Sequence, residues 1–281
     1  MSILLKLKGQ EQTLTGTTQT VVPDINPYGR EKSWETTLLE YGSKIFQAHR
    51  PLKGTDMYLI AFHPMKENPC HQMDAHHYCK QVNEDFAQCV LYDSNRDDAN
   101  LIGIEYIISE TLFRKLPYEE RKYWHPHNYE IISGYLVAPG LPEVAEKAFL
   151  KSKLNSYGKT IHTWRAKCWE GDQRFIDKLP YGPPIIGWSF NYDGEIKPEM
   201  QMKRDELMGI STQEKRDQRK DLVSYCHPQS GVNDLKQKYS PEKQGNLTAL
   251  AGVLDIKDVD GRNSMKAQEI IAQGKAGADR R

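Results

Sequence analysis

The sequence predicts a single α+β domain built on a mixed or antiparallel sheet flanked by helices. Short apolar runs of strand length alternate along the middle of the chain with segments that carry helix-start signals. The chain has 281 residues, and its hydrophobic fraction of 38% is below the usual range for a compact globule. We therefore expect one domain over residues 31–200, preceded by a polar arm (1–30) and followed by a charged helical and flexible extension (201–281).

The first two elements are predicted from apolar spacing and from the residues that bound them. From Ser33 to Ala48 the apolar positions suit a helix, with Ser33 as its N-cap. Asp56 to His63 is a short apolar run between Gly54 and Pro64, which indicates a buried strand.

The next segments combine an ambiguous stretch with the strongest strand of the chain. Ala75 to Phe86 could be helical, and Val90 to Tyr92 indicates a strand that turn-forming residues close. Leu101 to Ser109 is apolar at nearly every position, so we expect both faces of this strand to be covered. Glu105 is the exception at its centre.

The second half continues the alternation of helices and strands. Helices are predicted at 117–124, from Pro142 onward and at 203–222, the first two because proline favours the first turn. Strands are predicted at Tyr129–Val137, Lys159–Cys168 and Ile185–Phe190.

Composition and charge exclude several classes of protein. Basic and acidic side chains balance at 38 each, and a sequence pI of about 7.1 provides no global field for a nucleic-acid partner. No apolar run approaches the roughly 20 residues that a transmembrane helix needs. Five cysteines are an odd number with irregular spacing, so without an export signal we expect reduced thiols in a cytoplasmic protein.

The stretch from Pro69 to Ser94 holds the densest group of metal-ligating side chains. It contains three of the nine histidines and three of the five cysteines, namely His71, His76, His77, Cys70, Cys79 and Cys89. Imidazole and thiolate are the usual ligands of Zn and Cu. In a helix, His76 and His77 would point about 100° apart and could not both face one ion unaided. The alternative is that these histidines are hydrogen-bonded and pack the stretch against the core.

A second group follows in the segment from His125 to Glu130. Residues two apart lie on one side of an extended segment, so His125 and His127 could clamp one ion. With Glu130 and His162 they resemble the two-histidine, glutamate, histidine metal set of cupins, although the spacing from His127 to Glu130 is shorter. The alternative for His125 is a contact with the last carbonyls of the preceding helix.

Glu105 is the third candidate, because a carboxylate inside an apolar strand is costly to bury unless it is paired. It could form a salt bridge, ligate a metal or act as a general base with a raised pKa. A position at the sheet edge is the structural alternative. If the role is functional, its partner should be one of the histidines named above.

Several separate motifs, in the same order, resemble the oil body-associated protein family, a domain of unknown function found in plants, fungi and bacteria. They are His76-His77-Tyr78-Cys79, Asn83-Glu84-Asp85-Phe86, Gln88-Cys89, Leu91-Tyr92-Asp93-Ser94, the strand Leu101–Ser109, Trp124-His125-Pro126-His127, Tyr129-Glu130 and Tyr157-Gly158-Lys159-Thr160. The resemblance runs over roughly residues 35–195. It implies a fold more firmly than an activity, and it implies association with oil bodies, as for the plant members.

Three functional hypotheses follow. The leading one is a His-rich pocket, drawn from His76, His77, His125, His127 and His162, that binds a transition metal (Zn, Cu or Fe) and a small-molecule substrate, with the carboxylates Glu105 and Glu130 as catalytic groups. The second is a non-catalytic scaffold or peripheral lipid-droplet protein with structural histidines. The third is a metal-free enzyme with His76 or His77 as general base near Glu84 or Asp85.

The leading hypothesis makes one geometric prediction. His76 or His77 should lie within ligand reach of His127 or His162. A homo-oligomer is compatible with each hypothesis.

Overall fold

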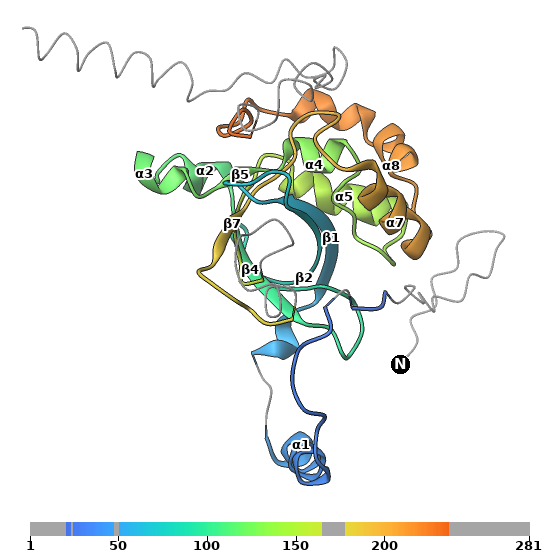
Figure 1. Cartoon of the computed structure of the whole chain (residues 1–281). Coiled ribbons are helices and arrows are strands. Elements are labelled where there is room, and N and C mark those ends of the chain that lie inside the picture. The colour runs from blue at the N-terminus through green and yellow to red at the C-terminus, as the bar shows by residue number, and fades with distance from the viewer. Residues whose placement is uncertain (1–20, 24, 48–50, 165–177, 236–281) are drawn as a thin grey trace, which may run out of the picture.

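An antiparallel sheet forms the centre of the molecule (Figure 1). The computed structural model describes residues 21–23, 25–47, 51–164 and 178–235. The strands are β1 (Met57–Pro64), β2 (Gln72–Asn83), β3 (Phe86–Tyr92), β4 (Leu101–Ile108), β5 (His125–Pro126), β6 (Tyr157–His162) and β7 (Ile185–Gly187). The helices are α1 (Trp34–Phe46), η1 (Leu52–Gly54), α2 (Glu110–Phe113), α3 (Tyr118–Arg121), α4 (Asn128–Ile132), α5 (Glu143–Lys153), α7 (Pro198–Met208), α8 (Thr212–Gln218) and η2 (Lys220–Tyr225).

The sheet is curled, so that strands from its two ends approach each other. The strand order is β1-β2-β3-β4-β6-β5, and β7 also pairs with β6. The end of β1 returns to β7, because Trp188 N donates to Pro64 O at 2.8 Å and Lys66 N donates to Ile186 O at 2.9 Å. The curl brings side chains from β1 close to side chains from β5 and β6, and Figure 1 shows the resulting ring of strands.

Strand register decides which side chains share a face of the sheet. Directly opposed residues of antiparallel strands point to the same face. Leu59 lies opposite His77, Cys79 opposite Cys89, and Cys89 opposite Glu105. His77 and Glu105 are therefore on one face, whereas the neighbouring His76 points to the other.

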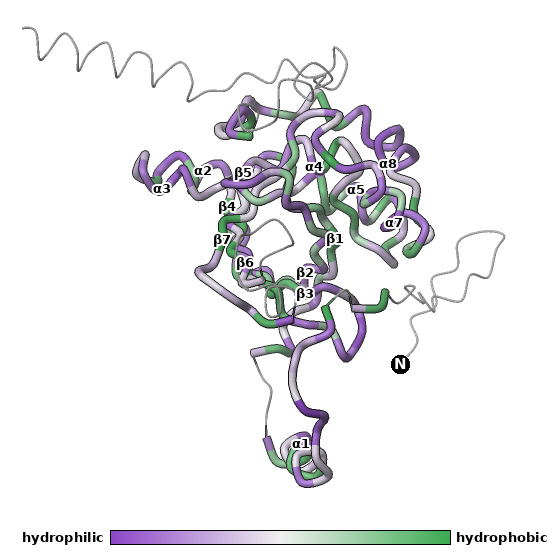
Figure 2. The backbone as a smooth tube through the Cα atoms, in the orientation of Figure 1, coloured by the Kyte–Doolittle hydropathy of each residue, from purple (hydrophilic) through white to green (hydrophobic). Residues whose placement is uncertain are grey.

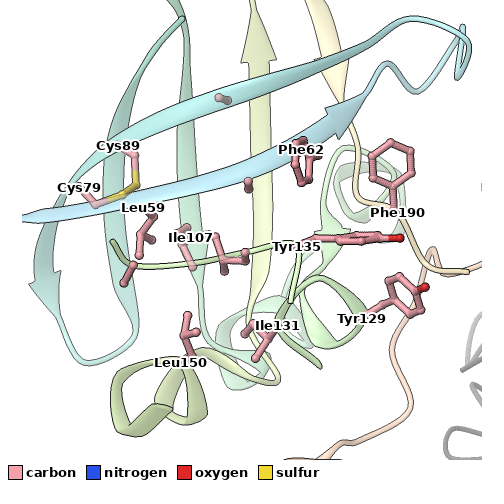
Figure 3. Close-up of a cluster of buried hydrophobic side chains, with 14 of the residues drawn as sticks. Leu59, Phe62, Cys79, Cys89, Ile107, Tyr129, Ile131, Tyr135, Leu150 and Phe190 are labelled. Carbon is pink, nitrogen blue, oxygen red and sulfur yellow. A yellow bond between two sulfur atoms is a disulfide. The ribbon is translucent and has the colours of Figure 1, made fainter. Parts of the chain in front are cut away.

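The face that carries His77 packs against helices. Leu59 and Ile107 from the sheet share one buried apolar cluster with Ile131 of α4 and Leu150 of α5. Figure 3 shows these sheet side chains directed at the two helices. Their burial stabilises the layer contact, at roughly 25 cal/mol for each Å² of apolar surface removed from water.

Residues 198–235 pack onto the same unit. Leu222 of η2 and Leu235 are at most 1% exposed. Arg219 is 1% exposed and donates to the carbonyl oxygens of Ile131 and Leu136 at 2.7 and 2.8 Å. The predicted helix at 203–222 is thus divided among α7, α8 and η2. Most of the predicted polar arm, residues 1–20, and the tail from 236 onward lie outside the described residues.

The structure confirms the α+β class, with an antiparallel sheet, and several predicted elements. The helix after the Ser33 N-cap, the strand at 56–63 and the strand at 101–109 appear as α1, β1 and β4. No helix among the described residues is long and apolar enough to cross a membrane.

Two predicted elements are wrong. The segment 75–86 is not helical, because β2 pairs with β1 along one edge and with β3 along the other. The segment 129–137 is not a strand, because Asn128–Ile132 forms α4. All five residues of α4 are buried, so its apolar composition reflects burial and not strand periodicity.

The prediction of reduced thiols is wrong for two cysteines. The register places Cys79 opposite Cys89 with their Cα atoms 4.0 Å apart, and the two form a disulfide. Among the described residues, Cys70 and Cys226 are free. The cysteines therefore do not support a reducing compartment.

Candidate metal centre

Six buried side chains from five different elements converge on the face of the sheet that packs against α4 and α5. Each is at most 3% exposed. They are His63 (β1), His77 (β2), Glu105 (β4), His125 (β5), His127 (the N-cap of α4) and Glu130 (α4).

Glu105 lies at the middle of this group, with two histidines at each carboxylate oxygen. Its Oε2 is 3.0 Å from His77 Nε2 and 3.6 Å from His63 Nε2. Its Oε1 is 3.3 Å from His127 Nε2 and 3.7 Å from His125 Nε2. The nitrogens of His125 and His127 are 3.2 Å apart. One carboxylate is thus surrounded by four imidazoles.

These donors form three overlapping triads in which the ligand atoms lie within 4.8 Å of one another. The triads are His63–His77–Glu105, Glu105–His125–His127 and His63–His125–Glu130. Nitrogen and carboxylate oxygen donors at such separations suit Zn, Fe, Cu or Ni.

The hydrogen bonds behind His77 and His127 show which nitrogen carries the proton. His77 Nδ1 lies 2.9 Å from the carbonyl oxygen of Ala75, which can only accept, so Nδ1 is protonated. The Ser156 hydroxyl uses its proton on Lys153 O at 2.7 Å, so it accepts from His127 Nδ1 at 2.8 Å. In the neutral form of either ring, Nε2 therefore carries the lone pair.

The same reasoning extends to His63 through His162. His162 Nδ1 donates to Ile102 O at 3.3 Å, so its Nε2 accepts from His63 Nδ1 at 3.0 Å. His63 therefore also presents an unprotonated Nε2 to Glu105. Outer partners that fix the tautomer in this way are typical of metal-ligating histidines.

The result is a set of nitrogen lone pairs directed at a carboxylate. Nε2 of His63, His77 and His127 all face oxygens of Glu105, and when the rings are neutral neither side has a proton to donate. Such a contact is repulsive unless a proton or a cation lies between the atoms.

Burial determines the charge states of the surrounding groups. Burial lowers the pKa of His125 and of His162 to about 3, and holds the pKa of His63 well below its usual value. Burial and the Glu105 charge raise the pKa of Glu130 well above its usual value. Burial also raises the pKa of Glu105, but the contacts of its carboxylate with the His127 and His77 rings outweigh burial and keep that pKa below its usual value.

Gly158 keeps a space open between three of the ligand atoms. A Cβ atom at this position of β6 would lie 2.5 Å from His125 Nε2 and 2.6 Å from His127 Nε2, and would also overlap Glu105 Oε1. These distances are about half an ångström longer than the roughly 2.0–2.1 Å of a bond from zinc to imidazole. A point that Gly158 leaves empty is therefore surrounded by one carboxylate oxygen and two imidazole nitrogens.

A cavity of about 180 Å³ opens onto this centre. Its lining includes His63, His77, Glu105, His127 and Glu130, so a small molecule in the cavity could reach the centre.

The structure assembles most of the sequence-predicted site residues and separates two of them. His77, Glu105, His125, His127 and Glu130 lie together, and His77 and His127 contact opposite oxygens of the same carboxylate. Their roles as ligands and catalytic groups remain predictions.

His76 and His162 do not join the triads. His76 lies on the opposite face of β2, where its Nδ1 is 2.6 Å from the Tyr58 hydroxyl. His162 is buried as well, and its Nε2 lies 3.0 Å from Nδ1 of His63, on the side of that ring away from Glu105.

Sequence reasoning missed His63. The available signal was its position at the end of the predicted strand 56–63, two residues after Ala61 and therefore on the same face. A single histidine in an apolar run gave no pattern to distinguish it from a core residue.

Comparison with known proteins places the chain in a family. Residues 49–223 match the family model described as a protein of unknown function, DUF1264. Oil body-associated protein 2B of Arabidopsis thaliana is 43% identical over 190 residues, which cover 66% of this chain and 74% of the relative. Oil body-associated protein 1A of Zea mays is 35% identical over 232 residues, which cover 83% and 90%.

No solved structure matches the chain. The match to the family model and the extent of these alignments agree with the resemblance found in its motifs. The chain belongs to the oil body-associated protein family.

Proposed function

We propose that this protein binds a transition-metal ion between Glu105 and the surrounding histidines. The observation that carries the proposal is the set of Nε2 lone pairs directed at the Glu105 carboxylate. A cation between these atoms replaces the repulsion by coordination bonds. The space that Gly158 leaves open supports a position for the ion between Glu105, His125 and His127, with His77 and His63 beside the second carboxylate oxygen.

Two orphaned polar atoms add support. His125 Nδ1 and Glu130 Oε1 are buried and have no hydrogen-bond partner. Unpartnered buried polar atoms are rare and need an explanation such as a bound ion or a functional role. Glu130 lines the cavity, so its raised pKa suits it to hold a proton beside a molecule bound there.

A bound ion would supply Lewis-acid or redox chemistry. The chain's own residues would orient it through the bonds from His77 to Ala75, from His127 to Ser156 and from His63 to His162. Most of the cavity wall is apolar, with Leu59, Ala61 and Ile107 among its residues.

Metal analysis of the purified protein tests this proposal. We expect one equivalent of Zn, Fe or Cu after incubation, and loss of that metal in His77→Ala and in His127→Ala. His76→Ala is the matched control, because it removes a buried histidine from the opposite face of the same strand. A wild-type protein that takes up none of these metals contradicts the proposal.

A second function is proposed for α1, namely attachment to a lipid surface. Trp34, Leu38, Tyr41 and Ile45 lie along one side of this helix and are 62–72% exposed. Figure 2 shows hydrophobic stretches on α1, which projects from the rest of the described chain. The relatives' names refer to oil bodies, and an amphipathic helix with aromatic and aliphatic residues on one face suits a lipid interface.

Flotation with triacylglycerol droplets coated in phospholipid tests the second function. The wild type should float, and a variant with Leu38→Ser, Tyr41→Ser and Ile45→Ser together should stay in the dense fraction. Val144→Ser is the control, since this exposed residue lies on α5. If the triple variant floats as well as the wild type, α1 is not the attachment site.

A further inference from the structure

The cavity beside the metal centre has two chemically different ends. Its inner end consists of the imidazoles and carboxylates described above. The opposite end is formed by residues that reach the surface, with Asp56 and Gln81 exposed and Lys153 half-buried. These three residues define its mouth.

The walls between the two ends are apolar. On the sheet side they are Leu59, Ala61, Ala87 and Ile107, and on the helix side Leu136 and Phe149. All except Phe149 are buried. Figure 3 shows Leu59 and Ile107 on the face of the sheet that meets the helices. An apolar chain in this space would be removed from water on all sides.

Lys153 is the cationic group of the mouth, and Asp56 is the anionic one. Lys153 is the last residue of α5, and its Nζ donates to Gln81 Oε1 at 2.7 Å. Asp56 and Glu84 are nearby and exposed, but neither forms an ion pair with Lys153 within 4.0 Å. Within the described ranges the hydrogen-bond partner of this half-buried ammonium is neutral, so Lys153 can pair with an anion at this end of the cavity.

We propose that the cavity binds a small amphiphilic carboxylate, with its head group at Lys153 and its apolar chain extending toward the metal centre. This inference rests on the proposed metal function for the identity of the inner end. A cavity of about 150 Å³ is known to hold benzene, so a space of about 180 Å³ suits a chain of about six carbons.

Charge favours this orientation over the reverse one. At the inner end the proposed ion already has the Glu105 carboxylate and imidazoles as ligands, whereas the Lys153 ammonium at the mouth has the neutral Gln81 amide as its hydrogen-bond partner. A cationic amphiphile would place its charge beside Lys153. A neutral apolar molecule would fill the space between the apolar walls but would leave the Lys153 ammonium without a bound anion.

Chain-length dependence tests the walls. Butanoate, hexanoate and octanoate are titrated calorimetrically into the full-length protein. Affinity should rise about fourfold for each added methylene group until the chain has about six carbons, and then level off. Hexylammonium should bind at least tenfold more weakly than hexanoate. Equal affinity for all three acids, or for hexylammonium and hexanoate, overturns the inference.

Substitution at the mouth tests the head group. Lys153→Met should weaken hexanoate binding about tenfold, and Lys153→Glu should reverse the preference in favour of hexylammonium. Lys80→Met is the matched control, because Lys80 lies on the opposite face of β2 and lines a different hollow. Unchanged hexanoate affinity in Lys153→Met overturns the assignment of the head group.

Metal content, measured on the same samples, separates this inference from the metal proposal. Lys153→Met should retain the wild-type metal content. Bound metal without hexanoate binding overturns the cavity inference alone. Hexanoate binding by wild-type protein that takes up no metal overturns the metal proposal alone. If removal of the metal abolishes hexanoate binding and Lys153→Met does not, the carboxylate binds the ion and the proposed orientation is wrong.

Discussion

The hydroxyl oxygen of Ser156 lies 2.8 Å from Nδ1 of His127 and accepts a hydrogen bond from it. This contact holds the ring in the tautomer whose Nε2 faces Glu105. Loss of an outer partner of this kind lowers metal affinity by roughly 10- to 100-fold. We therefore expect Ser156→Ala to bind metal that much more weakly than the wild type, as measured by competition with a chelator.

Ser152→Ala provides the control for Ser156→Ala. Both serines donate to the carbonyl oxygen three residues earlier, but Ser152 is exposed and lies on the outside of α5. Equal affinity in the two variants would mean that Ser156 does not orient a ligand.

Gly158 gives a steric test of the same centre. In Gly158→Ala the methyl group would occupy the space between His125, His127 and Glu105. We expect loss of stoichiometric metal binding and a loss of stability of about 1–3 kcal/mol from overpacking. Elemental analysis and thermal unfolding measure the two effects. Gly42→Ala is the control, because a Cβ atom there has no neighbour within 4 Å.

If Gly158→Ala folds and keeps the wild-type metal content, the ion is bound somewhere other than the space beside Gly158. The triad of His63, His77 and Glu105 would then be the better candidate, because the three atoms nearest a Cβ at Gly158 belong to Glu105, His125 and His127.

The sequence predicted those parts of the fold that depend on local pattern. The apolar runs at 56–63 and 101–109 could be predicted as strands because the signal lies within each run, in its apolar composition and in the residues that bound it. The segment at 75–86 is polar and irregular, and β2 forms there because two neighbouring strands supply its hydrogen bonds. Pairing with distant segments overrides such local preferences.

The candidate site shows the same division. Glu105 was correctly expected to meet a histidine, because an isolated buried carboxylate is costly. His76 and His77 were equivalent until the segment was known to be a strand, since only then does period two separate them. The contact of His63 with His162 joins residues 99 positions apart, and only the curl of the sheet reveals it.

The disulfide between Cys79 and Cys89 should contribute measurably to stability. In the loop-closure model a bridge across ten positions stabilises the folded chain by about 2–3 kcal/mol. Urea unfolding with and without a phosphine reductant should show a loss of this size for the wild type. The variant with Cys79→Ala and Cys89→Ala together should show no effect of the reductant. Five free thiols in the denatured, unreduced wild type would mean that the bridge is absent.

The buried pair of Glu146 and Arg219 connects the segment after residue 200 to α5. Arg219 Nη2 lies 3.1 Å from Glu146 Oε1, and both residues are at most 2% exposed. Arg219 also donates to two carbonyl oxygens at the end of α4 and just beyond it. Removal of Arg219 takes its donors away from Leu136 O and from the Glu146 carboxylate, while Ile131 O keeps the N–H of Gly134.

Arg219→Met should therefore destabilise the protein by about 3–5 kcal/mol in urea unfolding. Lys147→Met breaks another ion pair between α5 and η2, but the partner of Lys147 in that pair, Asp221, is exposed. Solvent already screens that pair, so we expect little change in this control. If both variants unfold at the same urea concentration, the buried pair does not anchor η2 to the domain. A selective loss in Arg219→Met would instead show that residues beyond 200 are needed to hold α4, and with it Glu130, in place.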